Sequence, residues 1–197
     1  IDIPLLEAVA ATGKPIIIST GMATQNEIKE ALNCVTQNGS GDVALLRTVS
    51  GYPAPPEEYN LETIKNMRDT FSVEVGLSDH TLSNTTAIAS VALGATIIEK
   101  HITLDRNGGG PDDKFSLNPK EFEQLCVQAK DAWKARGNVQ YGPKSSESVS
   151  LSHRKSLYFV KEMKQGDLIT PEHFKCIRPG NGLLPKYYKE IVGKVVK

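Results

Sequence analysis

The chain has 197 residues with 23 basic and 23 acidic side chains, so its formal net charge is zero. This balance gives no reason to expect a nucleic-acid partner or an anionic membrane. The three cysteines form no CxxC pair, which argues against a disulfide scaffold or zinc knuckle and favours a reducing cytoplasm. No apolar run approaches the roughly 18 residues of a membrane span.

Short apolar runs alternate with amphipathic segments over the first two-thirds of the chain. The first residues predict a loop and a helix with no strand before them, as in the middle of a longer domain. Strands are then predicted at 14–19, 42–49, 73–78 and 96–103, and helices at 25–38, 60–71, 85–93 and 118–135. Four strand–helix alternations predict βα units and a parallel sheet.

Two architectures have this alternation: a doubly wound open sheet and a (β/α)8 barrel. Polar residues close every predicted strand, namely Ser19, Thr20, Thr48, Ser50, Tyr52, Ser78, His80, Glu99 and His101. A barrel places its chemistry at the carboxyl ends of its strands, whereas a doubly wound sheet does so mainly at one switch point. We therefore predict an α/β fold with the C-terminal half of a (β/α)8 TIM barrel. About four strands should precede this sequence, because a barrel needs eight.

The character of the sequence changes after the last long helix. Residues 137–151 are polar and predict a linker. Beyond them, short strands are predicted at 156–160 and 175–178, with a turn at 179–182 and short helices after Thr170 and at 187–192. The segment 152–197 is therefore expected to be a small β-rich domain, also cut short.

His80 and His101 end consecutive predicted strands, so they should be neighbours. Ser78 and Glu99 lie two residues earlier and share their faces. Two neutral imidazoles, with water and substrate oxygens in the other positions, can hold Mn²⁺ or a similar ion. Two structural histidines bonded to the backbone would have the same spacing, so both interpretations stay open.

Asp79 and Lys100 alternate with these histidines along the strands. They should face the helix layer and form an ion pair there. This orientation also argues against an aldolase-type barrel, which needs a Schiff-base lysine inside the strand ring.

Three further features each have two interpretations. The turn Ser19-Thr20-Gly21 could bind a phosphate, although helix capping explains Thr20 or Thr24 equally well. The glycine-rich loop 104–116 is either a substrate loop or a solvated one, and it lacks a dinucleotide fingerprint. Arg178 could bind a carboxylate or phosphate, or could be an ordinary surface arginine.

Longer strings, in the same order over nearly the whole chain, resemble the sialic acid synthase family. That family condenses phosphoenolpyruvate with a 2-acetamido sugar to make nonulosonic acids. The strings are KPIIISTGMAT, SGYPAPPEEYNLETI, VGLSDHT, ALGATIIEKHITLDR, GPDDKFSL and RPGNGLLPKYY.

Within the family, the chain is most similar to members that make pseudaminic acid from a 2,4-diacetamido-2,4,6-trideoxy hexose. The strings behind this are Phe115-Ser116-Leu117, YGPKSSES with HRKSLYFVKE, and GLLPKYYKEIVGK. Alternatives are a neuraminic or legionaminic acid synthase, a spore-coat sugar enzyme, or an inactive fragment. We expect these 197 residues alone to be inactive.

The resemblance implies a (β/α)8 barrel followed by an antifreeze-like (SAF) domain, which is swapped over the partner's active site in a homodimer. The implied boundaries are 1–136 for the barrel half, 137–151 for the linker and 152–197 for the antifreeze-like domain.

It also implies roles for single residues. His80 and His101 would bind a divalent metal, Mn²⁺ with Mg²⁺ or Co²⁺ as alternatives. Ser50 stands where family members more often carry Asn, so it keeps a hydroxyl but lacks the amide. Lysine and acidic residues that the family supplies from earlier strands have no counterpart here. The implied substrate-binding residues are Ser19, Ser50 and Ser78 for phosphoenolpyruvate, and Tyr52, Asp112 and Arg178 for the sugar.

Overall fold

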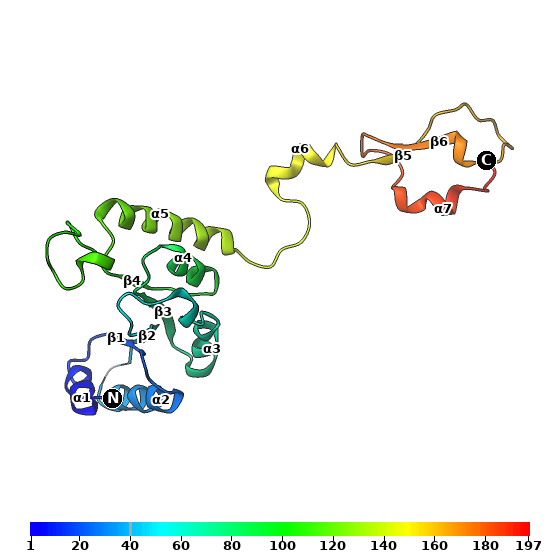
Figure 1. Cartoon of the computed structure of the whole chain (residues 1–197). Coiled ribbons are helices and arrows are strands. Elements are labelled where there is room, and N and C mark those ends of the chain that lie inside the picture. The colour runs from blue at the N-terminus through cyan, green and yellow to red at the C-terminus, as the bar shows by residue number, and fades with distance from the viewer. Residues whose placement is uncertain (40) are drawn as a thin grey trace. The chain divides into compact units, whose positions relative to one another are not determined.

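The computed structural model describes residues 1–39 and 41–197, which form two compact units, Ile1–Gly137 and Asn138–Lys197. The first unit contains a parallel sheet with the strand order β1-β2-β3-β4 (Figure 1). Each strand therefore pairs with the next one along the chain, as predicted. The strands are β1 (Ile16–Ser19), β2 (Val43–Arg47), β3 (Glu74–Asp79) and β4 (Ile98–Lys100).

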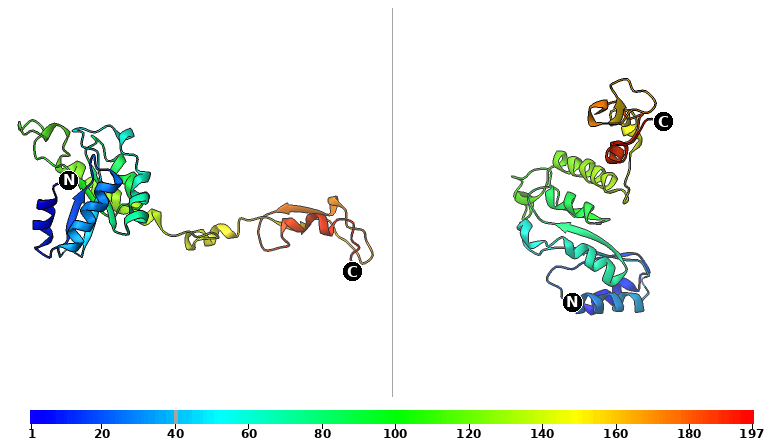
Figure 2. Two further views of the ribbon diagram at one scale, coloured as in Figure 1. Left: turned by 90° about the horizontal axis from the view of Figure 1, so that it is seen from below. Right: turned by 90° about the vertical axis from the view of Figure 1, so that its right-hand side faces the viewer.

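A helix follows each strand of this sheet. In Figures 1 and 2, α2, α3, α4 and α5 succeed one another in chain order along the first unit. None of the helices within 1–39 and 41–197 combines the length and apolar content that crossing a membrane requires. The helices of this unit are α1 (Ile3–Ala10), α2 (Gln25–Gln37), α3 (Glu62–Phe71), α4 (Thr85–Ala92) and α5 (Pro119–Arg136).

Side-chain caps fix where the two long helices begin. Thr24 and Glu27 form a reciprocal capping box at the start of α2, and Asn118 and Glu121 form another at the start of α5. Thr24 is therefore the cap, whereas the Thr20 hydroxyl donates to the Leu46 carbonyl at 2.9 Å. Because Thr20 links the ends of β1 and β2, it is not free to cap a helix.

The main core lies between the sheet and its helices. It contains Leu45, Ile64, Leu77 and Leu125, all buried. Ile17 is 57% exposed although it lies in β1 between two core-facing residues. Successive strand residues point to opposite faces, so the helices cover one face of β1 and leave the other open.

A buried ion pair joins β3 to β4 on the helix side. Lys100 Nζ lies 2.9 Å from Asp79 Oδ2, in a register that places these two residues opposite each other. The same ammonium donates to the Thr81 and Ser83 carbonyls, and the Thr81 amide donates to Asp79 Oδ1 at 2.8 Å. This confirms the predicted pair and shows that it also holds the loop after β3.

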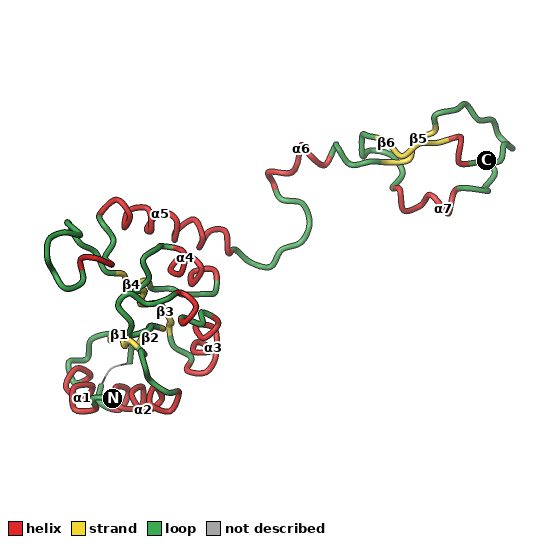
Figure 3. Tube along the Cα trace, viewed as in Figure 1, coloured by secondary structure: helices red, strands yellow, loops and turns green. Residues whose placement is uncertain are grey.

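The second unit is smaller than the first, and loops make up a larger share of it, as Figure 3 shows. Its antiparallel strands β5 (Ser156–Phe159) and β6 (Phe174–Ile177) pack around Leu157, Ile169 and Phe174. Two short helices, α6 (Ser148–Leu151) and α7 (Tyr188–Ile191), belong to it. The α6 turn lies within the stretch expected to be a linker, and the predicted domain boundaries stay a prediction.

Gly76 allows β3 to lie close to its neighbours. A Cβ at this position would lie 2.5 Å from the Ile97 carbonyl and 2.7 Å from Leu46 Cδ2. We expect Gly76→Ala to destabilise the first unit by about 1–3 kcal/mol, because the added methyl overpacks a buried position. Urea unfolding measures this. Gly41→Ala, which meets nothing within 4 Å, is the matched control, and equal effects of both changes would contradict the prediction.

Lys100→Met would leave the Asp79 carboxylate buried without its partner. Both side chains of the pair are almost fully buried, so we expect a loss of about 3–5 kcal/mol in the free energy of unfolding. Lys134→Met is the control, because Lys134 and Asp131 are exposed and their pair should contribute less than about 1 kcal/mol. If the double variant Asp79→Asn/Lys100→Met is no more stable than Lys100→Met, the uncompensated Asp79 charge does not cause the loss of stability in Lys100→Met.

Candidate active site at the ends of β3 and β4

The two histidines lie side by side at the carboxyl ends of adjacent strands. His80 directly follows β3 and His101 directly follows β4. Their ring centroids are 5.3 Å apart and the ring planes make an angle of 73°. His80 is buried, whereas His101 is partly exposed. The predicted neighbourhood of the two rings is confirmed.

The backbone around His80 selects one tautomer of its ring. Nδ1 lies 2.7 Å from the Val49 carbonyl oxygen. A carbonyl can only accept, so Nδ1 carries a proton and donates it in this contact. Nε2 lies 3.3 Å from Ser78 Oγ, whose hydroxyl donates to Glu99 Oε1 at 2.7 Å. The four polar side chains predicted to share this face are therefore close together.

Aromatic rings surround the imidazoles. Tyr52 stacks on His80, with centroids 4.2 Å apart and planes at 30°. The Phe115 ring meets the His101 ring edge to face, with centroids 5.1 Å apart, and its centroid lies 5.8 Å from that of Tyr52. These contacts fix the orientation of both imidazoles without using their nitrogen atoms.

The glycine-rich loop brings a carboxylate to His101. Asp112 Oδ2 lies 3.6 Å from His101 Nδ1. The next residue, Asp113, accepts from the Thr103 hydroxyl and from the Gly110 amide, both at 2.7 Å. These two hydrogen bonds, led by the one from Thr103, lower the pKa of Asp113. The loop is therefore held by its own internal bonds next to the histidines.

The histidines fit an open metal site. Metal–nitrogen bonds are about 2.0–2.1 Å long, so rings 5.3 Å apart are close enough to share one ion. A metal-bound histidine usually donates its other ring N–H to a fixed acceptor, as His80 does to Val49. Within the described ranges no group of three or more His, Cys, Asp and Glu side chains has metal-binding geometry.

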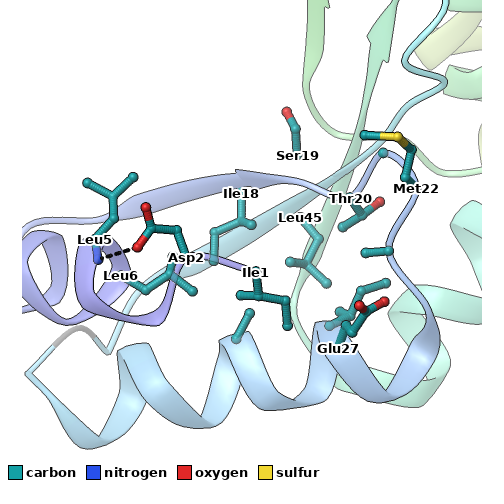
Figure 4. A pocket seen from close by; sticks show the side chains of 14 residues that line it. Ile1, Asp2, Leu5, Leu6, Ile18, Ser19, Thr20, Met22, Glu27 and Leu45 are labelled. Atoms are coloured by element: carbon teal, nitrogen blue, oxygen red, sulfur yellow. Dashed lines mark hydrogen bonds between the residues drawn. The ribbon is translucent and has the colours of Figure 1, made fainter.

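Ser19 and Ser50 lie near the ends of the two preceding strands. Ser50 Oγ would be only 2.3 Å from a Cβ placed on Gly21, so a side chain at position 21 would force the Ser50 hydroxyl to turn away. Ser19 is exposed, and Figure 4 shows its side chain on the opposite side of β1 from Ile18. Among the residues that the structure describes, no hydrogen bond joins either serine to His80 or His101.

A cavity of about 350 Å³ lies beside β1, between α1 and the start of α2 (Figure 4). Ser19 contributes to its lining, but most of the remaining side chains are apolar, including Leu5, Leu6, Ile18 and Leu45. This lining does not suit a phosphate or a sugar. The histidines lie outside it, so we place the candidate site at the strand ends instead.

Arg178 belongs to the second unit. It directly follows β6 and is exposed. Its predicted role toward a sugar stays a prediction.

Some contacts of the site have no signal in the sequence. The Val49 carbonyl and the Tyr59 hydroxyl both bind His80, and Phe115 packs on His101. A backbone carbonyl carries no side-chain pattern, and Tyr59 lies 21 residues before the histidine whose amide it binds. Tyr59 and Phe115 both stand in family strings, but the sequence assigned neither of them a contact with the histidines.

Two family models match the chain: the NeuB family over residues 1–141 and the SAF domain over residues 154–197. N,N'-diacetyllegionaminic acid synthase of Campylobacter jejuni is 41% identical over 98% of this chain and 59% of its own length. Pseudaminic acid synthase of Helicobacter pylori is 36% identical over 98% of this chain and 57% of its own length. The chain thus spans less than two thirds of these relatives.

Solved structures agree with these matches. The crystal structure of N-acetylneuraminic acid synthetase from Leptospira borgpetersenii, in complex with citrate, superimposes with a TM-score of 0.70. It is 35% identical, and the match covers 76% of this chain and 52% of that one. The predicted fold is confirmed: the first unit is the C-terminal half of a TIM barrel, and a SAF domain follows. The chain belongs to the NeuB family.

Proposed function

We propose that this chain is part of a nonulosonic acid synthase, which condenses phosphoenolpyruvate with a 2-acetamido sugar. The observation that carries the proposal is the convergence of Tyr52, His80, His101 and Asp112 where β3 and β4 end. Relatives that are named synthases match nearly the whole chain. Since the chain spans only part of their length, the activity is proposed for the complete protein.

The two histidines would bind a metal ion, and serine hydroxyls would bind phosphoenolpyruvate. His80 and His101 would hold a divalent ion, Mn²⁺ in preference to Mg²⁺ or Co²⁺, which supplies Lewis-acid polarisation of the sugar aldehyde when bound. Ser19, Ser50 and Ser78 would donate to the phosphate and carboxylate of phosphoenolpyruvate, since fixed donors stabilise developing negative charge. Tyr52 and Asp112 would contact the sugar, and Arg178 of the SAF domain would contact the sugar bound by the other subunit of a domain-swapped dimer.

The chemistry requires one carbon–carbon bond and one hydrolytic step. C3 of phosphoenolpyruvate attacks the aldehyde carbon of the open-chain sugar. Water adds to C2 of the resulting oxocarbenium ion, and the tetrahedral intermediate releases phosphate by C–O cleavage. The Ser78 hydroxyl lies 3.3 Å from His80 Nε2 and donates to Glu99, so it would turn from Glu99 to donate to bound phosphoenolpyruvate.

For the sugar, we propose a 2,4-diacetamido-2,4,6-trideoxy hexose that gives pseudaminic acid. Legionaminic acid is the second candidate, because the Campylobacter jejuni relative named for that type of product is 41% identical. N-acetylneuraminic acid is a third.

The three cysteines are unpaired, which fits a cytoplasmic enzyme. We also propose that the complete protein is a domain-swapped homodimer.

The complete protein should release phosphate from phosphoenolpyruvate with a 2,4-diacetamido-2,4,6-trideoxy hexose, and more slowly with N-acetylmannosamine. Chromatography against authentic pseudaminic, legionaminic and neuraminic acids identifies the product. A legionaminic product would replace the first candidate by the second. Turnover of N-acetylmannosamine without turnover of the trideoxy hexose would contradict both the pseudaminic and the legionaminic acid candidates.

His80→Ala or His101→Ala should reduce metal-dependent turnover by more than about 100-fold, because a direct ligand should matter at least as much as the groups around it. Phosphate release measured after chelation and addition of Mn²⁺ tests this. His153→Ala, an exposed histidine of the second unit, is the control. Wild-type rates in metal-stripped protein would exclude the metal role.

A further inference from the structure

The segment between β2 and α3 supplies four contacts to His80. The Val49 carbonyl accepts from Nδ1 at 2.7 Å, and the Tyr52 ring stacks on the imidazole. The Ala54 amide donates to the His80 carbonyl at 3.1 Å, and the His80 amide donates to the Tyr59 hydroxyl at 2.7 Å. One loop therefore fixes both the ring and the backbone of this residue.

The Tyr59 contact replaces a sheet hydrogen bond. The Leu77 amide donates to the Ile97 carbonyl beside β4, so by alternation the His80 amide faces the β2 side of β3. The pairing of β2 with β3 ends at Arg47 and Leu77, so the His80 amide has no place in that ladder. His80 is buried, and a buried amide without a partner is costly. The phenol oxygen is thus the group that satisfies the backbone where the strand ends.

Tyr59 itself is held firmly. Its side chain is completely buried in the main core, next to residues such as Ile64 and Leu77. The Arg47 guanidinium donates from Nε to the Tyr59 carbonyl at 2.9 Å. Burial is the main cause that raises the pKa of Tyr59 to about 12, so the phenol is neutral at physiological pH. Its oxygen is therefore a fixed, uncharged acceptor.

We propose that Tyr59 is a positioning residue, whose hydroxyl holds the His80 backbone so that the ring donates to Val49 and presents Nε2 to the bound ion. Only the part of this inference that concerns the bound ion rests on the proposed function. The orientation of the ring is a property of the chain itself. A group that orients a metal ligand typically affects metal affinity or activity by about 10–100-fold.

Tyr59→Phe in the complete protein removes only the hydroxyl and keeps the packed ring. Titration with Mn²⁺, monitored by electron paramagnetic resonance, should show a dissociation constant weakened by about tenfold, and kcat should fall while KM for phosphoenolpyruvate stays nearly constant. Tyr141→Phe, at a position 93% exposed, should change none of these.

A second measurement needs no metal. In metal-free protein labelled with ¹⁵N-histidine, long-range ¹H–¹⁵N spectra report which ring nitrogen carries the proton. His80, identified by its loss in His80→Gln, should appear as the Nδ1–H tautomer in the wild type. In Tyr59→Phe it should appear as a mixture, because the ring is no longer held against Val49.

The outcomes separate the two proposals. A lower melting temperature for Tyr59→Phe, with unchanged Mn²⁺ affinity and unchanged tautomer, would overturn the positioning role. A variant that does not fold would overturn it as well, since the hydroxyl would then serve the whole core. Wild-type Mn²⁺ affinity in His80→Ala would instead contradict the proposed metal binding by His80. The tautomer spectra would still test the role of Tyr59.

Discussion

The buried ion pair between Asp79 and Lys100 is the constraint on which the site depends. It joins β3 to β4 at their last paired residues and points toward the helices. Because successive strand residues face opposite sides, the next residues, His80 and His101, turn to the other face. The same ammonium holds the loop after β3. The ion pair thus holds the two strand ends together through a contact that neither ring makes, and the segment after β2 then orients the His80 ring.

Around this pair, consecutive βα units each add one part of the site. The segment after β2 supplies Tyr52 and the acceptors for His80, and the loop after β4 supplies Asp112. Polar groups that must approach a ligand are thereby carried on loops, while strands and helices provide the rigid support. An arrangement of this kind suits catalysis, since bound groups need fixed positions rather than mobile ones.

Prediction from the sequence succeeded where the pattern is local. Apolar periodicity located the four parallel strands and the helices between them, and Pro119 correctly marked the start of α5. It was less accurate at strand ends: β4 covers only Ile98–Lys100, because Ile102 bridges to Leu117 instead of extending the pairing with β3. Pairing partners depend on the folded chain, so no sequence window contains this information.

The sequence by itself therefore determined the alternation of strands and helices, the two histidines at neighbouring strand ends and, through long strings, the family. Tertiary structure decided the tautomer of His80, the stacking of Tyr52 and the role available to Tyr59. The reason is physical. Periodicity follows from the geometry of one strand or helix, whereas these contacts join atoms 21 to 31 residues apart, which only the packed chain brings within bonding distance.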